Sequence, residues 1–171
     1  MIQLLFYFFE LLSLKGSPSD APYSANLLAA LILVDISLVA IGNYGFGSAN
    51  AIVDAIVSPA LLVAGIAGIL ALRNTSARLM QTLTAYFGAV VPLKLLTLGL
   101  ALVYQTFNAP QAGTLANFFA LGMLCMVLWH TALLTHILRA SANWFAVQAL
   151  PAAIALTIFM AVGAQLLMPV G

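Results

Sequence analysis

Charge is what this sequence has least of. Charged residues make up 5% of the 171 residues, hydrophobic residues make up 64%, and the mean hydropathy is +1.15. A soluble domain carries about a quarter charged residues, and a soluble protein this apolar would lack the polar groups to cover its surface. The net charge of +1 leaves no basic surface for nucleic acid. We therefore expect a protein whose solvent is the lipid bilayer, with no nucleic-acid partner.

Cysteine and the common catalytic motifs are scarce as well. Cys125 is the only cysteine, which excludes an internal disulfide, and its apolar surroundings predict a small buried side chain. The sequence contains no HExxH, GxSxG, P-loop or CxxC motif. His130 and His136 are six residues apart, whereas two ligands of one metal on a helix are three or four apart. We therefore expect no enzyme activity, no catalytic residue, no metal ion and no cofactor.

Long apolar runs are what the sequence does contain. They lack the alternation of membrane strands, so they predict helices, and at about 20 residues per span the chain has room for roughly four to six. The expected fold class is all-α, a polytopic helical membrane protein with five transmembrane helices preceded by a short interfacial amphipathic helix. The predicted elements are an interfacial helix at 1–15, a linker at 16–24, and a five-helix transmembrane domain at 25–171 with spans at about 26–42, 51–72, 79–104, 115–136 and 144–168.

The basic residues predict an orientation. Lys15, Arg73, Arg78 and Arg139 all fall on one side of the membrane in this arrangement, with Arg139 in the loop after the fourth span. The opposite loops and the C-terminal residues carry no Lys or Arg. Because basic residues favour the cytoplasmic side, we expect a cytoplasmic N-terminus and a C-terminus on the outer side.

Three charged residues fall within the predicted spans: Asp35, Asp54 and Lys94. Asp35 and Lys94 each lie about 10 residues from the end of their spans, which places both at a depth of roughly 15 Å. Asp54 lies about one turn below the outer surface, as a possible third member. Intramembrane charges are usually paired or functional. The Asp35 and Lys94 pair therefore suits either a structural ion pair that fixes helix register or a relay for protons or solutes, and a role towards a partner subunit is a third interpretation.

Two further polar features lie close to Lys94 or deep in a span. Pro92 removes the hydrogen bond to the Gly88 carbonyl, which predicts a kink and a free acceptor near Lys94, although ordinary relief of packing strain also explains a proline here. His130 follows Trp129 within the fourth predicted span. We expect it to be a hydrogen-bonded core histidine rather than a haem or metal ligand. His136 lies near the membrane surface, where contact with headgroups is expected.

Three segments carry a family resemblance: KGSPSDAPYS, ARLMQTLTAYFGAVVPLKLL and LWHTALLTHILRA. Together they resemble small bacterial five-span membrane proteins similar to the Yip1 family, over about residues 15–139. The resemblance implies five helical spans, a cytoplasmic N-terminus and a bacterial inner membrane with a periplasmic C-terminus. Eukaryotic Yip1 proteins act with small GTPases and carry a long acidic N-terminal domain that is lacking here, so that role is not carried over. The resemblance supplies no catalytic residue.

Two functions remain open from the sequence. The first is a non-enzymatic membrane scaffold or accessory subunit that packs with other membrane proteins or with itself. Its contact would be a ladder of small residues, which lets helices approach closely, formed by Ala60, Ala64 and Gly68. The alternative is a small oligomeric channel or transporter that uses the intramembrane residues Asp35, Asp54, Lys94 and His130. Whether these polar side chains line a cavity or pair inside a dry bundle discriminates between the two.

Overall fold

The protein is a helical polytopic membrane protein. The computed structural model describes residues 2–45, 48, 50–106 and 113–167, and all regular structure in these ranges is helical. Five helices are long and apolar enough to cross a membrane, and a short helix precedes them, as the sequence predicts. The elements in chain order are α1 (Ile2–Leu12), η1 (Pro18–Asp20), α2 (Ala25–Gly45), α3 (Ala51–Leu72), η2 (Ser76–Arg78), α4 (Leu79–Thr106), α5 (Gly113–Ser141) and α6 (Ala146–Leu167).

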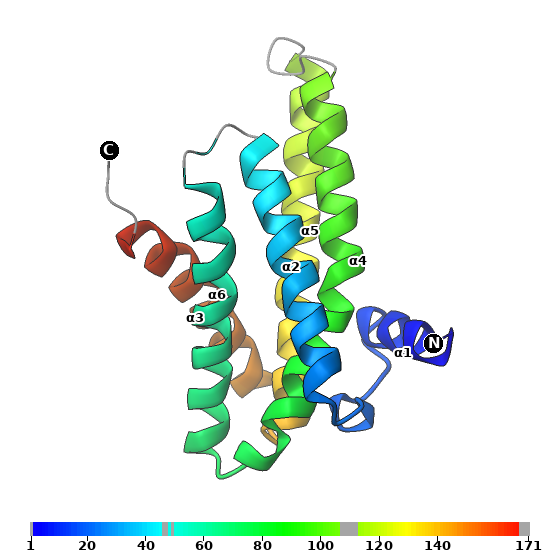
Figure 1. Ribbon diagram of the computed structural model, residues 1–171, viewed down its shortest axis with the longest axis vertical. Helices are drawn as coiled ribbons and strands as arrows, with labels where there is room; N and C mark the ends of the chain where they lie inside the picture. Colours follow the sequence, from blue (N-terminus) through cyan, green and yellow to red (C-terminus); the bar gives the residue numbers. More distant parts are fainter. Residues whose placement is uncertain (1, 46–47, 49, 107–112, 168–171) are drawn as a thin grey trace.

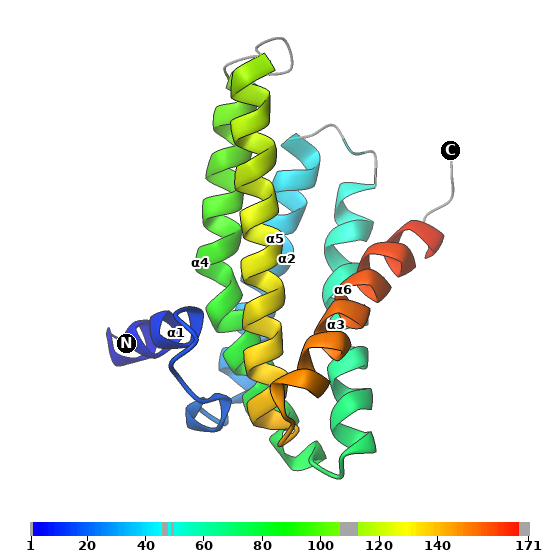
Figure 2. The same cartoon turned by 180° about the vertical axis from the view of Figure 1, so that it is seen from behind.

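The five long helices form a ring. Helix α2 packs against α3 and α4, α3 packs against α6, and α5 joins α6 to α4. The order around the ring is therefore α2, α3, α6, α5, α4, which differs from the order in the chain. Helices α2 to α5 run roughly along the long axis of the molecule, whereas α6 is inclined to it (Figures 1 and 2). This arrangement leaves all five helices facing one central space.

The outer faces of the helices are apolar. Large hydrophobic side chains lie exposed on the long helices, as a surface in contact with lipid requires; examples are Leu33, Ile56, Leu96, Leu128 and Val147. Cys125 is also exposed, so the prediction of a buried cysteine is wrong. The reason is that lipid and protein core are equally apolar, and an apolar run therefore does not reveal which face of a helix points inward.

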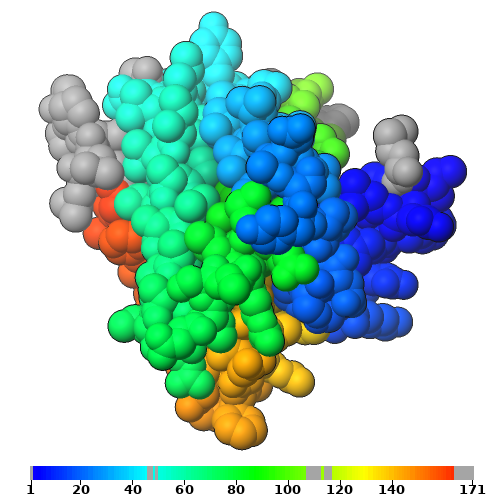
Figure 3. Space-filling view, turned by 60° about the horizontal axis from the view of Figure 1, so that its bottom comes forward, coloured from blue at the N-terminus to red at the C-terminus, as the bar shows by residue number. Residues whose placement is uncertain are grey.

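Arginine residues tie the chain together at the end of the ring where α3 meets α4 and α5 meets α6. The Arg78 guanidinium donates hydrogen bonds to the carbonyls of Ala140 and Ser141, at 3.3 Å each, and to the side chain of Asn143 at 3.0 Å. The two turns lie side by side when this end of the molecule is brought forward (Figure 3). Arg139 belongs to the last turn of α5 rather than to the following loop, because the helix continues past its apolar part. Arg73, Arg78 and Arg139 therefore gather at this end of the bundle.

Asparagines end two of these helices. Asn74 follows α3 and Asn143 follows α5, and both adopt left-handed φ angles of 55° and 53°. A left-handed residue just beyond a helix turns the chain away and lets later N–H groups reach the last carbonyls. Thr75 N donates to the Leu70 carbonyl and Trp144 N donates to the Arg139 carbonyl, both at 2.9 Å. The two turns at this end therefore have the same construction.

Helix α1 packs across the outside of the ring against α4 (Figure 1). It ends at Leu12 rather than at residue 15, because Leu14 adopts a φ of 60° and leaves the helical conformation. Phe8 and Leu11 are buried, so one face of α1 contacts protein. The following linker leads to α2, whose first turn is capped where Leu27 N donates to Ser24 Oγ.

Among the described residues, the predicted ladder of small residues is not packed against another helix. Ala60, Ala64 and Gly68 are exposed on α3, and the space that a Cβ atom of Gly68 would occupy has no atom within 4 Å. The close approach to α6 occurs at Gly65, where a Cβ atom would lie 2.2 Å from Leu156 Cδ1. The ladder is therefore one residue out of register with the face that packs inside the bundle.

Candidate functional site

A cavity of about 530 Å³ lies at the centre of the helix ring. All five long helices line it, through residues 35–43 of α2, 58–62 of α3, 86–101 of α4, 123–130 of α5 and 157–161 of α6. These segments lie mostly in the middle turns of the helices, away from the arginine-rich turns. The volume falls within the roughly 300–1,000 Å³ of small-molecule sites in proteins. The walls are mainly apolar, with a few polar groups among them.

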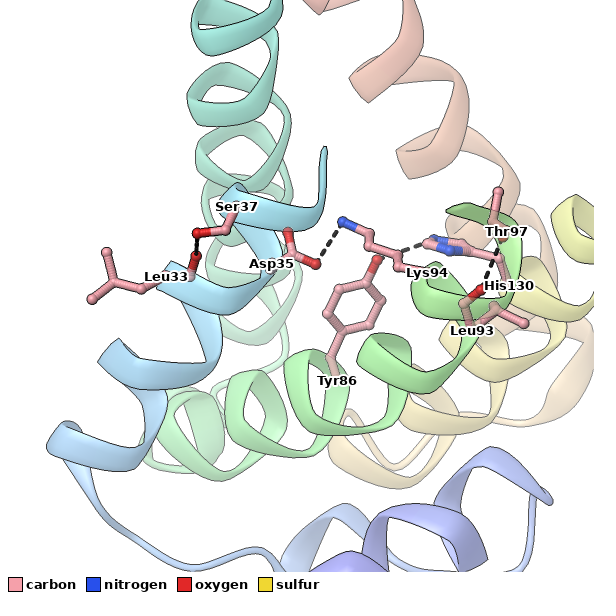
Figure 4. A network of polar contacts seen from close by, with 8 residues as sticks. All are labelled: Leu33, Asp35, Ser37, Tyr86, Leu93, Lys94, Thr97 and His130. Carbon is pink, nitrogen blue, oxygen red and sulfur yellow. Dashed lines mark hydrogen bonds and ion pairs between the residues drawn. The ribbon is translucent and has the colours of Figure 1, made fainter. Parts of the chain in front are cut away.

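The first polar feature is an ion pair across the cavity wall. Lys94 Nζ of α4 contacts Asp35 Oδ1 of α2 at 2.5 Å, and Figure 4 shows the two side chains meeting between these helices. This is the pairing that their matched depths predict. Asp35 is 1% exposed and Lys94 is 27% exposed. The carboxylate is therefore enclosed, while the ammonium remains accessible.

The second polar feature is a hydrogen bond between α4 and α5. Tyr86 Oη and His130 Nε2 are 3.0 Å apart, and their rings meet edge to face with centroids 5.8 Å apart. His130 is thus a hydrogen-bonded histidine inside the bundle, as predicted. The described residues contain no cluster of His, Cys, Asp or Glu side chains that would hold a metal ion.

Helix α4 carries one member of each polar pair. Tyr86 and Lys94 are eight residues apart, which places them about 80° apart around the helix, and both line the cavity. Lys94 reaches α2 and Tyr86 reaches α5, as Figure 4 shows. Because α2 and α5 are the neighbours of α4 in the ring, the two contacts fix α4 on both sides.

Two hydroxyl groups, one in the cavity wall and one on the exposed side of α2, are bonded within their own helices. Thr97 Oγ1 donates to the Leu93 carbonyl at 2.9 Å, and Ser37 Oγ donates to the Leu33 carbonyl at 2.8 Å (Figure 4). No side-chain or backbone group in the described ranges donates a hydrogen bond to Asp35. The negative charge of the Asp35 carboxylate is therefore compensated by the Lys94 ammonium.

Asp54 takes no part in the pair. It lies half-buried in the first turn of α3 and does not line the cavity. Lys94 pairs with Asp35 alone among the described acidic residues. The prediction of Asp54 as a third member is therefore wrong, and the reason is depth, since Asp35 and Lys94 lie further from the end of the bundle.

Helix α1 lies directly behind the part of α4 that forms the site. Helix α4 continues through Pro92 without interruption, and the neighbouring Gly88 faces α1. A Cβ atom at Gly88 would lie 2.0 Å from the Phe8 ring, so only glycine lets the two helices meet this closely. Trp129 Nε1, next to His130 in the chain, donates to the Leu12 carbonyl at 3.1 Å.

The linker after α1 is also bonded to the bundle. His136 Nε2 lies 2.7 Å from the Gly16 carbonyl, so it contacts the linker backbone instead of the predicted lipid headgroups. Tyr7 Oη donates to the Ser17 carbonyl at 2.9 Å. Burial raises the pKa of the Tyr7 hydroxyl, and the nearby Asp20 carboxylate raises it further. Tyr7 therefore remains a neutral donor well above its ordinary titration range.

Comparisons with models of protein families, with curated proteins and with solved structures find no match to this chain. The resemblance to the Yip1 family therefore stays a prediction. The structure itself defines the class, a multi-pass helical membrane protein with five apolar helices. Its distinguishing feature is a cavity that holds an ion pair and a tyrosine–histidine pair.

Proposed function

We propose that the protein is a small, non-enzymatic membrane transporter that holds its solute in the central cavity. The observation that carries this proposal is the placement of the intramembrane polar groups. Asp35, Lys94, Tyr86 and His130 all line one cavity of about 530 Å³. Enclosing charges in a membrane is costly, and a dry structural bundle would fill the surrounding space with side chains. A space beside the charges instead suits a bound solute.

The distribution of basic residues supports an orientation for this transporter. Arg73, Arg78 and Arg139 lie at the end of the bundle away from the cavity. Under the positive-inside rule that end is cytoplasmic. The cavity then lies near the middle of a bacterial inner membrane, with the N-terminus in the cytoplasm. The surrounding lipid and further copies of the chain are the expected partners.

Access of water to the cavity tests the proposal. Thr97 lines the cavity, whereas the adjacent Leu96 is exposed on the outer face of α4. Each is changed to cysteine in a Cys125→Ser background, since Cys125 is itself exposed. A membrane-impermeant thiol reagent added to spheroplasts should label Thr97→Cys and leave the lipid-facing Leu96→Cys unlabelled. If the reagent labels neither Thr97→Cys nor Leu96→Cys, whichever side of the membrane it is added to, the cavity is closed to water and the transport proposal is contradicted.

The ladder on α3 supports a second candidate function, that of a scaffold or accessory subunit. Ala60, Ala64 and Gly68 are exposed side by side, and nothing lies within 4 Å of a Cβ atom built at Gly68. Such a face suits a helix from another copy or another membrane protein. Ala64→Leu should then weaken cross-linking between copies or co-purification of other membrane proteins. Unchanged assembly would remove this candidate and leave the transporter proposal intact.

A further inference from the structure

The two charges at the cavity are not equally available to a ligand. Lys94 is 27% exposed and Asp35 is 1% exposed, although both line the cavity. A molecule in the cavity therefore meets the ammonium, with the carboxylate behind it. An ammonium has three N–H donors, and Lys94 Nζ contacts Asp35 Oδ1 as an ion pair. No other acceptor for Lys94 is found among the described residues. The remaining donors suit oxygen atoms of a ligand.

The net charge of the site excludes a strongly charged ligand. Asp35 and Lys94 are the only Asp, Glu, Lys or Arg residues among the described residues that line the cavity, and their charges cancel. A ligand carboxylate would add an unpaired negative charge next to Asp35, and a ligand ammonium would add a positive charge next to Lys94. Either charge is costly in an environment of low polarity. An uncharged oxygen acceptor, such as a carbonyl, receives the Lys94 hydrogen bonds without this cost.

The rest of the cavity suits an apolar body. Its walls include Leu38, Leu62, Leu98 and Val127, together with Met126 and Met160. Methionine side chains adapt to irregular apolar shapes. The volume of about 530 Å³ equals that of roughly 18 water molecules at about 30 Å³ each. A chain on the order of twelve carbons with a small headgroup fits within this volume.

The cavity is also placed for entry from the bilayer. On the α5 side, Met123 and Val127 line the cavity and are exposed as well. Helix α6, which forms the adjoining wall, is inclined away from α5 towards its C-terminal end (Figure 2). The cavity wall therefore reaches the lipid-facing surface at Met123 and Val127, where an apolar molecule dissolved in the lipid can enter without crossing water.

From these observations we infer that the cavity binds an uncharged amphiphile, an apolar chain that ends in an oxygen acceptor held by Lys94. This inference rests on the proposed transport function and names its substrate class. The ligand lies with its oxygen at the Asp35–Lys94 pair and its chain between α5 and α6. Membrane-soluble ketones, quinones and long-chain alcohols share this chemistry.

Binding of three probes of about twelve carbons tests the inference: 2-dodecanone, dodecanoate and dodecylammonium, each radiolabelled. The full chain is reconstituted in lipid nanodiscs, and binding to empty nanodiscs is subtracted. The ketone should bind at least about tenfold more tightly than either charged probe. Lys94→Met should weaken ketone binding at least about tenfold, because it removes a hydrogen bond from a charged donor. Lys15→Met is the matched control, since Lys15 lies outside the cavity.

A second pair of variants keeps the charges in place. Met126→Trp fills the cavity and should reduce ketone binding by a similar factor. Leu128→Trp changes the exposed face of the same helix and should leave binding unchanged. Tighter binding of a charged probe, sensitive to Met126→Trp, would overturn the ligand class and leave the transporter standing. If no probe shows binding that depends on the cavity, the inferred ligand class is refuted. If Thr97→Cys is labelled by the thiol reagent, the proposed transport function still stands; if Thr97→Cys is not labelled, the transport function is refuted as well.

Discussion

Removing Lys94 should destabilise the protein far more than removing Asp35. The Asp35 carboxylate is 1% exposed and has no hydrogen-bond donor in the described ranges. Lys94→Met therefore leaves its buried charge without a partner. Asp35→Asn leaves an ammonium that is 27% exposed at the cavity, and its flexible stem lets it move towards water or lipid headgroups. The asymmetry follows from burial, because both changes remove the same ion pair.

The expected magnitudes differ accordingly. Leaving a buried charge without its partner costs about 3–5 kcal/mol, which we expect for Lys94→Met. At about 2–4 °C of melting temperature per kcal/mol for a chain of this size, its melting temperature should fall by about 6–20 °C. Asp35→Asn should cost about 1–3 kcal/mol. The double variant Asp35→Asn with Lys94→Met contains neither charge and should be more stable than Lys94→Met alone.

Unfolding in detergent, followed by circular dichroism, measures these differences. The three variants and wild type form a double-mutant cycle, with a coupling free energy expected at about 1–3 kcal/mol. Lys15→Met controls for the loss of a lysine, since Lys15 is exposed. Equal losses for Lys94→Met and Asp35→Asn, or losses that add in the double variant, would refute the argument from burial.

Three further predictions concern the contacts around α1 and the arginine-rich turns. Gly88→Ala should displace α1 and speed tryptic cleavage after the helix, since a Cβ atom there would lie 2.0 Å from the Phe8 ring; Phe8→Ala should compensate. Gly99→Ala is the control, because its Cβ atom would have no neighbour within 4 Å, and equal cleavage of both variants would contradict the close contact. Arg78→Met removes hydrogen bonds to three acceptors and should cost about 1–3 kcal/mol in thermal unfolding; an unchanged melting temperature counts against it. The folded state raises the pKa of Tyr7, so above about pH 10 the unfolded chain loses this proton first and stability falls as pH rises. Melting curves from about pH 9 to 11 should show a steeper loss for wild type than for Tyr7→Phe, and parallel curves would exclude the effect.

The five helices and one of the two polar pairs were predictable from the sequence. Apolar runs of sufficient length in lipid have few alternatives to helices. Asp35 and Lys94 were matched by depth, because an intramembrane charge demands a partner. Tyr86 was not predicted as the partner of His130, since a neutral tyrosine in an apolar run makes no such demand. The available signal was depth: among the hydroxyl groups of the neighbouring spans, Tyr86 lies close enough in depth to His130 to be a candidate partner.

The order of helices around the ring was not predictable in the same way. In soluble proteins, polar residues mark the outer face of a helix, whereas here the outer face is as apolar as the inner one. Helix α3 shows the consequence. Gly65 and Gly68 are both small, yet only Gly65 has a Cβ position closely filled by α6, and Ala60 and Ala64 are exposed. The docking of α1 depends on the fit between Phe8 and Gly88. These residues are 80 positions apart in the sequence, so no local pattern predicts their contact.

The attachment of α1 also constrains how the protein is made. The Leu12 carbonyl is bonded by Trp129, and the Gly16 carbonyl is bonded by His136, which lie 117 and 120 residues later in the chain. At synthesis rates of about 5–20 residues per second, the first helix waits roughly 6–25 s for these partners to leave the ribosome. Until α4 has also been made, its apolar face has no protein to cover it. The N-terminal segment must therefore be sheltered by lipid or by the insertion machinery until α4 arrives, and its hydrogen bonds to Trp129 and His136 form only after α5 follows.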